Sequence, residues 1–227
     1  LQERIRTEFA TTDMLPSALG DKLPRWDFVV PLGLSYFIFQ SVGYVIDVYR
    51  GKLPAQKNPL KYGLFVSFFP QMVQGPISRY DQLAPQLLAE RSLDWRDLKF
   101  GIQLCLWGYF KKLVIADRAA VLVNAVITEN CPYGGAVFAS GILFYCIQLY
   151  CDFSGGIDIT RGVARLFGID MAENFRRPIF ATSLTDYWRR WHITLGAWMR
   201  DYVFYPISLS RGFGKLSRWA RTHIGGT

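Results

Sequence analysis

The segment Tyr187-Trp188-Arg189-Arg190-Trp191-His192 places one of the chain's two histidines among aromatic rings and guanidinium groups. Imidazole has an ordinary pKa close to neutral pH, so His192 is a candidate general base. Tryptophan and arginine also gather where a protein meets a membrane surface, and a histidine there would only help to anchor the chain. The local sequence leaves both interpretations open.

A helix over about 184–203 is predicted to carry this histidine. Ser183-Leu184-Thr185-Asp186 has the form of a capping box that starts such a helix. At 100° per residue, Trp188 and Met199 fall on the same apolar face as His192. We therefore expect His192 to face the interior of a helical bundle or tunnel from this helix, with both side chains nearby.

Arginines flank the predicted apolar face. Arg189 and Arg200 are placed to offer cations to a phosphate or carboxylate, whereas Arg190 can pair with Asp186 one turn earlier. Contact of the arginines with lipid headgroups is the alternative. Gly196 leaves room beside the imidazole, either for a ligand or for a closely packed helix.

Other kinds of chemistry have little support in the sequence. The cysteines form no C-x-x-C pair, and with two histidines they predict neither a disulfide framework nor a metal site. They are Cys105, Cys131, Cys146 and Cys151. The formal charge of +8 comes from short basic clusters between apolar runs, unlike a nucleic-acid-binding surface. We expect no metal, no bound cofactor and no nucleic-acid partner.

The composition favours a membrane protein with basic loops, because 51% of the residues are hydrophobic and 16% are aromatic. Apolar runs predict membrane spans at about 28–48, 60–75, 100–127 and 134–153. The second run ends in proline and glycine, so it is either a short span or one that breaks within the membrane. Residues 81–99 are expected outside the hydrocarbon, and residues 157–180 as a surface helix and loop.

Several charged and polar residues fall inside or at the end of these runs. Lys111 and Lys112 either face a protein interior or extend to the membrane surface, and we favour the second arrangement. Asp152 and Ser154 end a predicted span, where such groups usually satisfy one another or a broken helix end. A Ser154 nucleophile activated by His192 is conceivable, but the G-x-S-x-G turn is missing.

Three segments carry a resemblance to a known family. WRRWHITLGAWMRDY at 188–202, FFPQMVQGPISRY at 68–80 and YCDFSG at 150–155 resemble signature segments of the membrane-bound O-acyltransferase (MBOAT) family. Residues 37–41 and 46–51 also resemble its bacterial branch. That branch includes alginate and peptidoglycan O-acetyltransferases and the teichoic acid D-alanyl transfer protein.

The resemblance implies an all-α fold, a polytopic membrane helical bundle in which 1–227 is a single partial MBOAT domain and an internal fragment. It implies an O-acyltransferase that moves an acyl group, expected to be acetyl, toward hydroxyls of an exported polysaccharide or cell-wall polymer. The donor is a cytoplasmic acyl thioester, either acetyl-CoA or a carrier-bound acyl group. His192 is then catalytic, and six residues are expected to bind substrate or support it: Trp188, Arg189, Trp191, Arg200, Asp152 and Ser154.

The resemblance also predicts a location and partners. We expect a multi-pass protein of the bacterial cytoplasmic membrane that contacts lipids, a polysaccharide acceptor and a periplasmic or extracellular acyltransferase. The family's second histidine, in a Trp-His-Gly segment, is expected outside this chain, because His223 lacks that context. Gly156 stands where the family usually has tyrosine. The alternatives are a teichoic acid D-alanyl transfer protein and a non-enzymatic transporter or export scaffold, although no inverted repeat supports the transporter.

Overall fold

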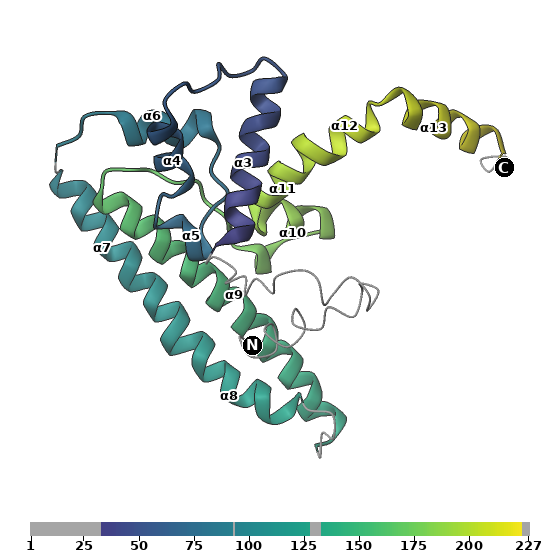
Figure 1. Ribbon diagram of the computed structural model, residues 1–227. Helices are drawn as coiled ribbons and strands as arrows, with labels where there is room; N and C mark the ends of the chain where they lie inside the picture. Colours follow the sequence, from purple (N-terminus) through teal and green to yellow (C-terminus); the bar gives the residue numbers. More distant parts are fainter. Residues whose placement is uncertain (1–32, 93, 128–132, 224–227) are drawn as a thin grey trace, which may run out of the picture. The chain divides into compact units, whose positions relative to one another are not determined.

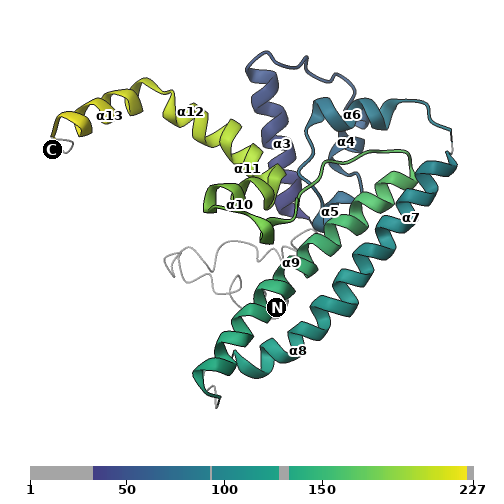
Figure 2. The same ribbon diagram turned by 180° about the vertical axis from the view of Figure 1, so that it is seen from behind.

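A long helical hairpin organises the chain in the computed structural model, which describes residues 33–92, 94–127 and 133–223. Helix α7 (Trp95–Tyr109) continues through a π-helical stretch, η1 (Phe110–Ala116), into α8 (Asp117–Val126). This continuous rod packs along α9 (Gly135–Leu166), as both views show (Figures 1 and 2). The described elements all belong to the unit Leu32–Thr227.

Glycines allow the two rods to approach backbone to backbone. A Cβ on Gly108 would lie 2.6 Å from the Gly155 carbonyl oxygen, and one on Gly101 would lie 2.8 Å from that of Gly162. The paired glycines are seven residues apart on each rod and run in opposite directions, so the rods are antiparallel. Small residues at the contact are typical of helices packed within membranes, where close van der Waals contact drives association.

The first part of the described chain forms shorter helices. Helix α3 spans Leu34–Tyr49, α4 spans Pro59–Val66, α5 spans Gln71–Gln74 and α6 spans Tyr80–Leu88. The Asn58 side chain caps α4 by accepting hydrogen bonds from the amides of Leu60 and Lys61. A core of Phe65, Phe68, Leu83, Ala164, Ile169 and Met171 joins α4 and α6 to the C-terminal end of α9.

The last part follows α9 through an irregular segment. It contains η2, a 3₁₀ turn at Pro178–Phe180, then α10 (Leu184–Arg190), α11 (Ile193–Met199) and the π-helical η3 (Arg200–Phe204). Helices α12 (Tyr205–Ser208) and α13 (Arg211–His223) end the described chain. Helix α3 lies beside α11 in both views (Figures 1 and 2), and Trp198 joins them by donating from its indole nitrogen to the Phe39 carbonyl at 3.0 Å.

The all-α prediction is confirmed for the described residues, which contain one isolated β-bridge and no strand. One described helix, α9, is long and apolar enough to cross a membrane. The run at 60–75 is interrupted between α4 and α5, and its place in a membrane stays a prediction. Residues 28–32 of the first predicted span and Cys131 lie outside the described residues. The single domain over 1–227 and the number of spans stay predictions.

Two predictions about the hairpin are wrong. Helix α9 does not end near Phe153 but continues to Leu166, into the segment predicted as a separate surface helix and loop. Lys111 does not extend to the membrane surface, since it is 7% exposed and its Nζ lies 2.7 Å from Asp158. Both corrections concern the same place, where Lys111 on η1 and Asp158 on the continued α9 neutralise each other between the rods.

Candidate active site

His192 lies at a break between two helices. The predicted continuous helix over 184–203 is wrong, because α10 ends at Arg190 and His192 takes the left-handed conformation (φ 44°, ψ 54°) as the N-cap of α11. Ser183 does cap α10, accepting from the Asp186 amide at 3.1 Å, and Asp186 pairs with Arg190 at 2.9 Å as expected. Non-glycine residues in this conformation are costly and cluster at functional sites.

Contacts with the segment that follows α9 stabilise the interruption between α10 and α11. The Ile193 amide donates to the Asn174 carbonyl at 3.0 Å, the Arg176 amide donates to the Arg190 carbonyl at 3.0 Å, and Phe175 forms a β-bridge with Trp191. These contacts use backbone groups that a continuous helix would have paired internally. The helix therefore stops because of tertiary pairing that the local sequence does not reveal.

The His192 ring packs against two phenylalanines. Its centroid lies 4.9 Å from that of Phe153 on α9 and 6.5 Å from that of Phe175. Burial lowers the pKa of His192, which keeps the imidazole neutral at physiological pH. Its Nδ1 is buried without a hydrogen-bond partner among the described residues. The ring contacts of His192 are with phenylalanine, whereas Trp188 and Met199 are 60% and 45% exposed, and their place beside the imidazole stays a prediction.

Thr194 joins the motif segment at 188–202 to the one at 68–80 and to the segment after α9, while Phe153 of the third motif packs on His192. The Thr194 hydroxyl accepts from the Ile77 amide at 3.0 Å and donates to the Asn174 side chain at 2.7 Å, and its own amide donates to the same Asn174 oxygen at 2.9 Å. A Cβ on Gly156 would overlap the side chain of Gln74, so glycine at this position lets α5 approach α9. Segments far apart in the sequence therefore meet around one short helix.

A second set of contacts fixes α11 and η3 against α3. The Tyr202 hydroxyl donates to Asp47, and Arg79 pairs with Asp201. Partial burial favours the neutral carboxyl, but hydrogen bonds from Arg79 and Arg200 outweigh it and lower the pKa of Asp201. Burial and the Asp47 carboxylate raise the pKa of Tyr202, which therefore stays a donor. The helix after His192 is thus anchored at both ends.

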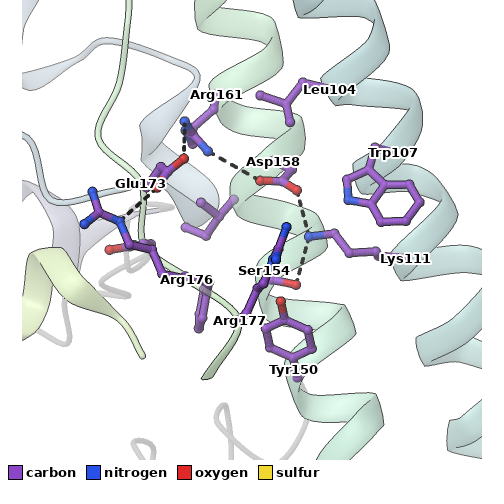
Figure 3. Close-up of a pocket in the computed structure, with 13 residues that line it drawn as sticks. Leu104, Trp107, Lys111, Tyr150, Ser154, Asp158, Arg161, Glu173, Arg176 and Arg177 are labelled. Carbon is purple, nitrogen blue, oxygen red and sulfur yellow. Dashed lines mark hydrogen bonds and ion pairs between the residues drawn. The ribbon is translucent and has the colours of Figure 1, made fainter. Parts of the chain in front are cut away.

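A cavity of about 530 Å³ opens between the rods and the segment after α9 (Figure 3). Its charged lining residues are Lys111, Asp158, Arg161, Glu173, Arg176 and Arg177. Lys111 donates to the Ser154 hydroxyl at 2.9 Å as well as pairing with Asp158. His192 is not a lining residue, but its neighbour Phe175 is. The cavity and the histidine are therefore adjacent, with an aromatic wall in common.

Some of the residues expected to support catalysis lie between the rods or against Phe175, and the others lie away from the cavity. Asp152 pairs with Lys112, and Ser154 binds Lys111 rather than His192, so the geometry gives no Ser154–His192 pair. Trp191 packs edge to face on Phe175 at 4.9 Å. Trp188 and Arg189 are exposed on α10, and Arg200 pairs with Asp201; none of these lines the cavity.

Sequence reasoning missed the charged lining of the cavity. Ser154, Asp158 and Arg161 are spaced i, i+4 and i+7, so they share one helix face, and this spacing was the available signal. A helix that ends near Phe153, as the apolar run predicts, does not include Asp158 or Arg161 and so does not show this face. Within the described ranges, no group of three His, Cys, Asp or Glu side chains is placed to hold a metal ion.

The fold and the three motifs that meet around His192 and Thr194 define a class of protein. The family model for MBOAT, the membrane-bound O-acyltransferase family, matches residues 53–224, and the chain belongs to this family. A probable alginate O-acetylase, AlgI, of Pseudomonas syringae pv. tomato is 37% identical over 191 residues, which cover 84% of this chain and 36% of the relative.

Two relatives with other names also match. The peptidoglycan O-acetyltransferase of Helicobacter pylori is 32% identical over 209 residues, covering 81% of this chain and 40% of the relative. The teichoic acid D-alanyltransferase of Bacillus subtilis is 32% identical over 186 residues, covering 80% and 46%. The chain therefore spans less than half the length of these relatives. The family resemblance drawn from the motifs is confirmed.

Proposed function

We propose that this chain is the part of an O-acyltransferase that supplies a histidine base. The observation that carries the proposal is the partly buried His192 at a helix break, where Phe153 of one motif packs on its ring and Ile77 of another donates to the neighbouring Thr194. A neutral imidazole carries one ring nitrogen with a free lone pair, which can accept a proton or a hydrogen bond from a substrate.

The reaction needs two proton movements at this base. The imidazole accepts the proton of an acceptor hydroxyl as its oxygen attacks the carbonyl carbon of an acyl thioester. The carbon–sulfur bond then breaks, and the leaving thiolate takes the proton back from the imidazolium. Products are an ester and a free thiol, and His192 returns to its neutral state. Anchoring of α11 by Thr194, Trp198 and Tyr202 supports this role, because the base must stay fixed relative to both substrates.

The proposed acyl group is acetyl and the proposed acceptor is an exported polysaccharide or cell-wall polymer, in keeping with the names of the relatives. We place the protein in the bacterial cytoplasmic membrane as a multi-pass protein. The donor would be acetyl-CoA or a carrier-bound acyl thioester, and a periplasmic or extracellular acyltransferase would receive the group or complete the transfer. The family's second histidine would be contributed by residues outside this chain.

Replacing the histidine in the full-length parent protein tests the base. His192→Asn suits the test because asparagine tolerates the left-handed conformation but cannot act as a base near neutral pH. His223→Asn is the matched control, since His223 lies exposed on α13 against Trp219. We expect His192→Asn to abolish O-acylation of the cell's polymers and His223→Asn to leave it unchanged, with both proteins present at wild-type levels.

Mass spectrometry of the released ester identifies the acyl group. Acetyl would support the proposal, whereas D-alanyl would assign the chain to the function named for the Bacillus relative. Unchanged ester content in His192→Asn at wild-type protein level would contradict the catalytic role.

A further inference from the structure

The cavity beside His192 carries more positive than negative charge. Four cationic side chains line it, Lys111, Arg161, Arg176 and Arg177, against the two carboxylates of Asp158 and Glu173. Figure 3 shows the ion pairs running in a chain from Lys111 through Asp158, Arg161 and Glu173 to Arg176. The remaining cation, Arg177, has no ion pair within the described part of the chain.

The cations differ in how firmly they are paired. Lys111 and Arg176 make close pairs, at 2.7 Å to Asp158 and 3.0 Å to Glu173. The two terminal nitrogens of Arg161 lie 3.7 and 3.8 Å from their carboxylates, longer than a charge-assisted hydrogen bond. Its Nε donates to the Met171 carbonyl at 3.3 Å. Arg161 and Arg177 therefore keep guanidinium donors that these carboxylates do not saturate.

The backbone fixes Arg177 at the cavity by a strained conformation. Arg177 has φ 48° and ψ 58°, and it precedes Pro178, a position where backbone freedom is already restricted. Among the described non-glycine residues, only His192 shares a positive φ. Such conformations persist where surrounding contacts impose them. The neighbouring residues Asn174 and Arg176 hydrogen-bond to the segment around His192. The same contacts therefore hold the backbone at both Arg177 and His192.

We propose that this cavity binds an oxyanion carried by one of the substrates, with Arg177 and Arg161 as its principal donors. Leu104, Trp107 and Phe175 form an apolar wall of the cavity, and low-polarity side chains beside a charge strengthen its attraction to an anion. A phosphoryl group on the thioester donor and a carboxylate on an acidic sugar acceptor offer the same chemistry. The identity of the carrier rests on the proposed acyl transfer, whereas binding of the anion itself does not.

Direct binding is measured first, on the full-length parent protein in detergent, with inorganic pyrophosphate and glucuronate as the probes. Arg177→Gln and Arg161→Gln remove one guanidinium each, and Arg177→Lys keeps the charge. Arg118→Gln is the control, an exposed arginine on α8 that does not line the cavity. Calorimetric titration should show binding weakened about tenfold or more in each glutamine variant, the scale of one charge-assisted hydrogen bond, and unchanged in the control.

The binding measurement decides the proposal. If neither probe binds the wild type, or if both glutamine variants bind as tightly as wild type while folded, the cavity is not an oxyanion site. Size-exclusion profiles establish folding, and having two independent variants keeps the test decisive when one of them fails to fold. His192→Asn should bind the probes like wild type without transferring acyl groups. A His192→Asn protein that still transfers would overturn the proposed base and leave the binding result standing.

Steady-state kinetics then distinguish the two sources of the anion. Arg177→Gln should raise the KM about tenfold for the substrate that carries the oxyanion and should leave the KM of a matched substrate without it unchanged. Acetyl-CoA is compared with an N-acetylcysteamine thioester, and an acidic oligosaccharide with a neutral one. A selective rise in either pair supports the proposal and names the carrier. Equal KM changes for charged and uncharged substrates in both pairs would overturn it.

Discussion

At the scale of single residues, the local environment of His192 determines the pH range in which it can act. An imidazole accepts a proton only while neutral, and burial against Phe153 and Phe175 lowers the pKa of His192 below its ordinary 6.5. The imidazole is therefore half protonated only at a pH below 6.5. We expect kcat/KM to approach a plateau as pH increases and to fall as pH decreases, with an apparent pKa below 6.5 in the pH–rate profile.

Removing a phenylalanine that packs on His192 should raise the pKa of the imidazole. In Phe175→Ser the imidazole gains contact with water, which favours its charged form and raises the pKa toward 6.5. The acid limb of the profile should then shift to higher pH. Phe144→Ser is the control, since Phe144 is exposed on α9 away from the histidine. An acid limb that stays in place in Phe175→Ser would show that another group controls it.

A second residue-scale prediction concerns Asn174, which accepts two hydrogen bonds from Thr194 through one side-chain oxygen. Asn174→Ala leaves the Thr194 amide without its acceptor, at a cost of about 1–3 kcal/mol, and loosens the helix break. Asn58→Ala removes a helix cap of α4 remote from the site and costs roughly 1 kcal/mol. Both variants should lose stability in thermal unfolding, but only Asn174→Ala should lower kcat. Equal kcat values in the two variants would show that Asn174 does not help to position His192.

At the scale of elements, the glycine contact between the rods is the most sharply testable feature. A Cβ on Gly108 would lie 2.6 Å from the Gly155 carbonyl oxygen and 2.7 Å from Ile159, so Gly108→Ala forces the rods apart. We expect a loss of about 1–3 kcal/mol in denaturant unfolding. Gly63→Ala is the matched substitution, because its Cβ meets nothing within 4 Å and alanine favours α4 by roughly 1 kcal/mol. Similar stability of the two variants would mean that the rods are not in close contact.

Which elements could be predicted depended on whether their causes are local. The cap at Ser183 and the pair between Asp186 and Arg190 lie within four residues, and both were predicted from spacing. The break at His192 was not predictable in this way, because its cause is the pairing with residues 174–176. The burial of Lys111 depends on Asp158, which is 47 positions away in the numbered sequence. Helix periodicity carries no information about such partners.

At the scale of the whole molecule, the motifs recognised in the sequence prove to be one structure. Thr194 contacts Ile77 and Asn174, His192 contacts Phe153, and Tyr202 contacts Asp47. Each contact joins the helix after the break to a different part of the described chain. This explains why the motifs could be identified from sequence while their purpose could not, since each supplies one wall or anchor of a common site.

The apolar surface of the hairpin makes the last prediction, which concerns the membrane itself. Leu143 lies near the middle of the predicted span at 134–153 and is 60% exposed, so its side chain is expected to meet lipid. An arginine there costs about 2.5–3.5 kcal/mol during insertion. Leu143→Arg should therefore reduce the fraction of full-length protein that stays in the membrane pellet after carbonate extraction. Leu88→Arg, at the end of α6 and 41% exposed, makes the same change in a segment expected outside the hydrocarbon and should leave that fraction unchanged. Equal membrane retention of both variants would show that the exposed apolar face of α9 is covered by protein instead of lipid.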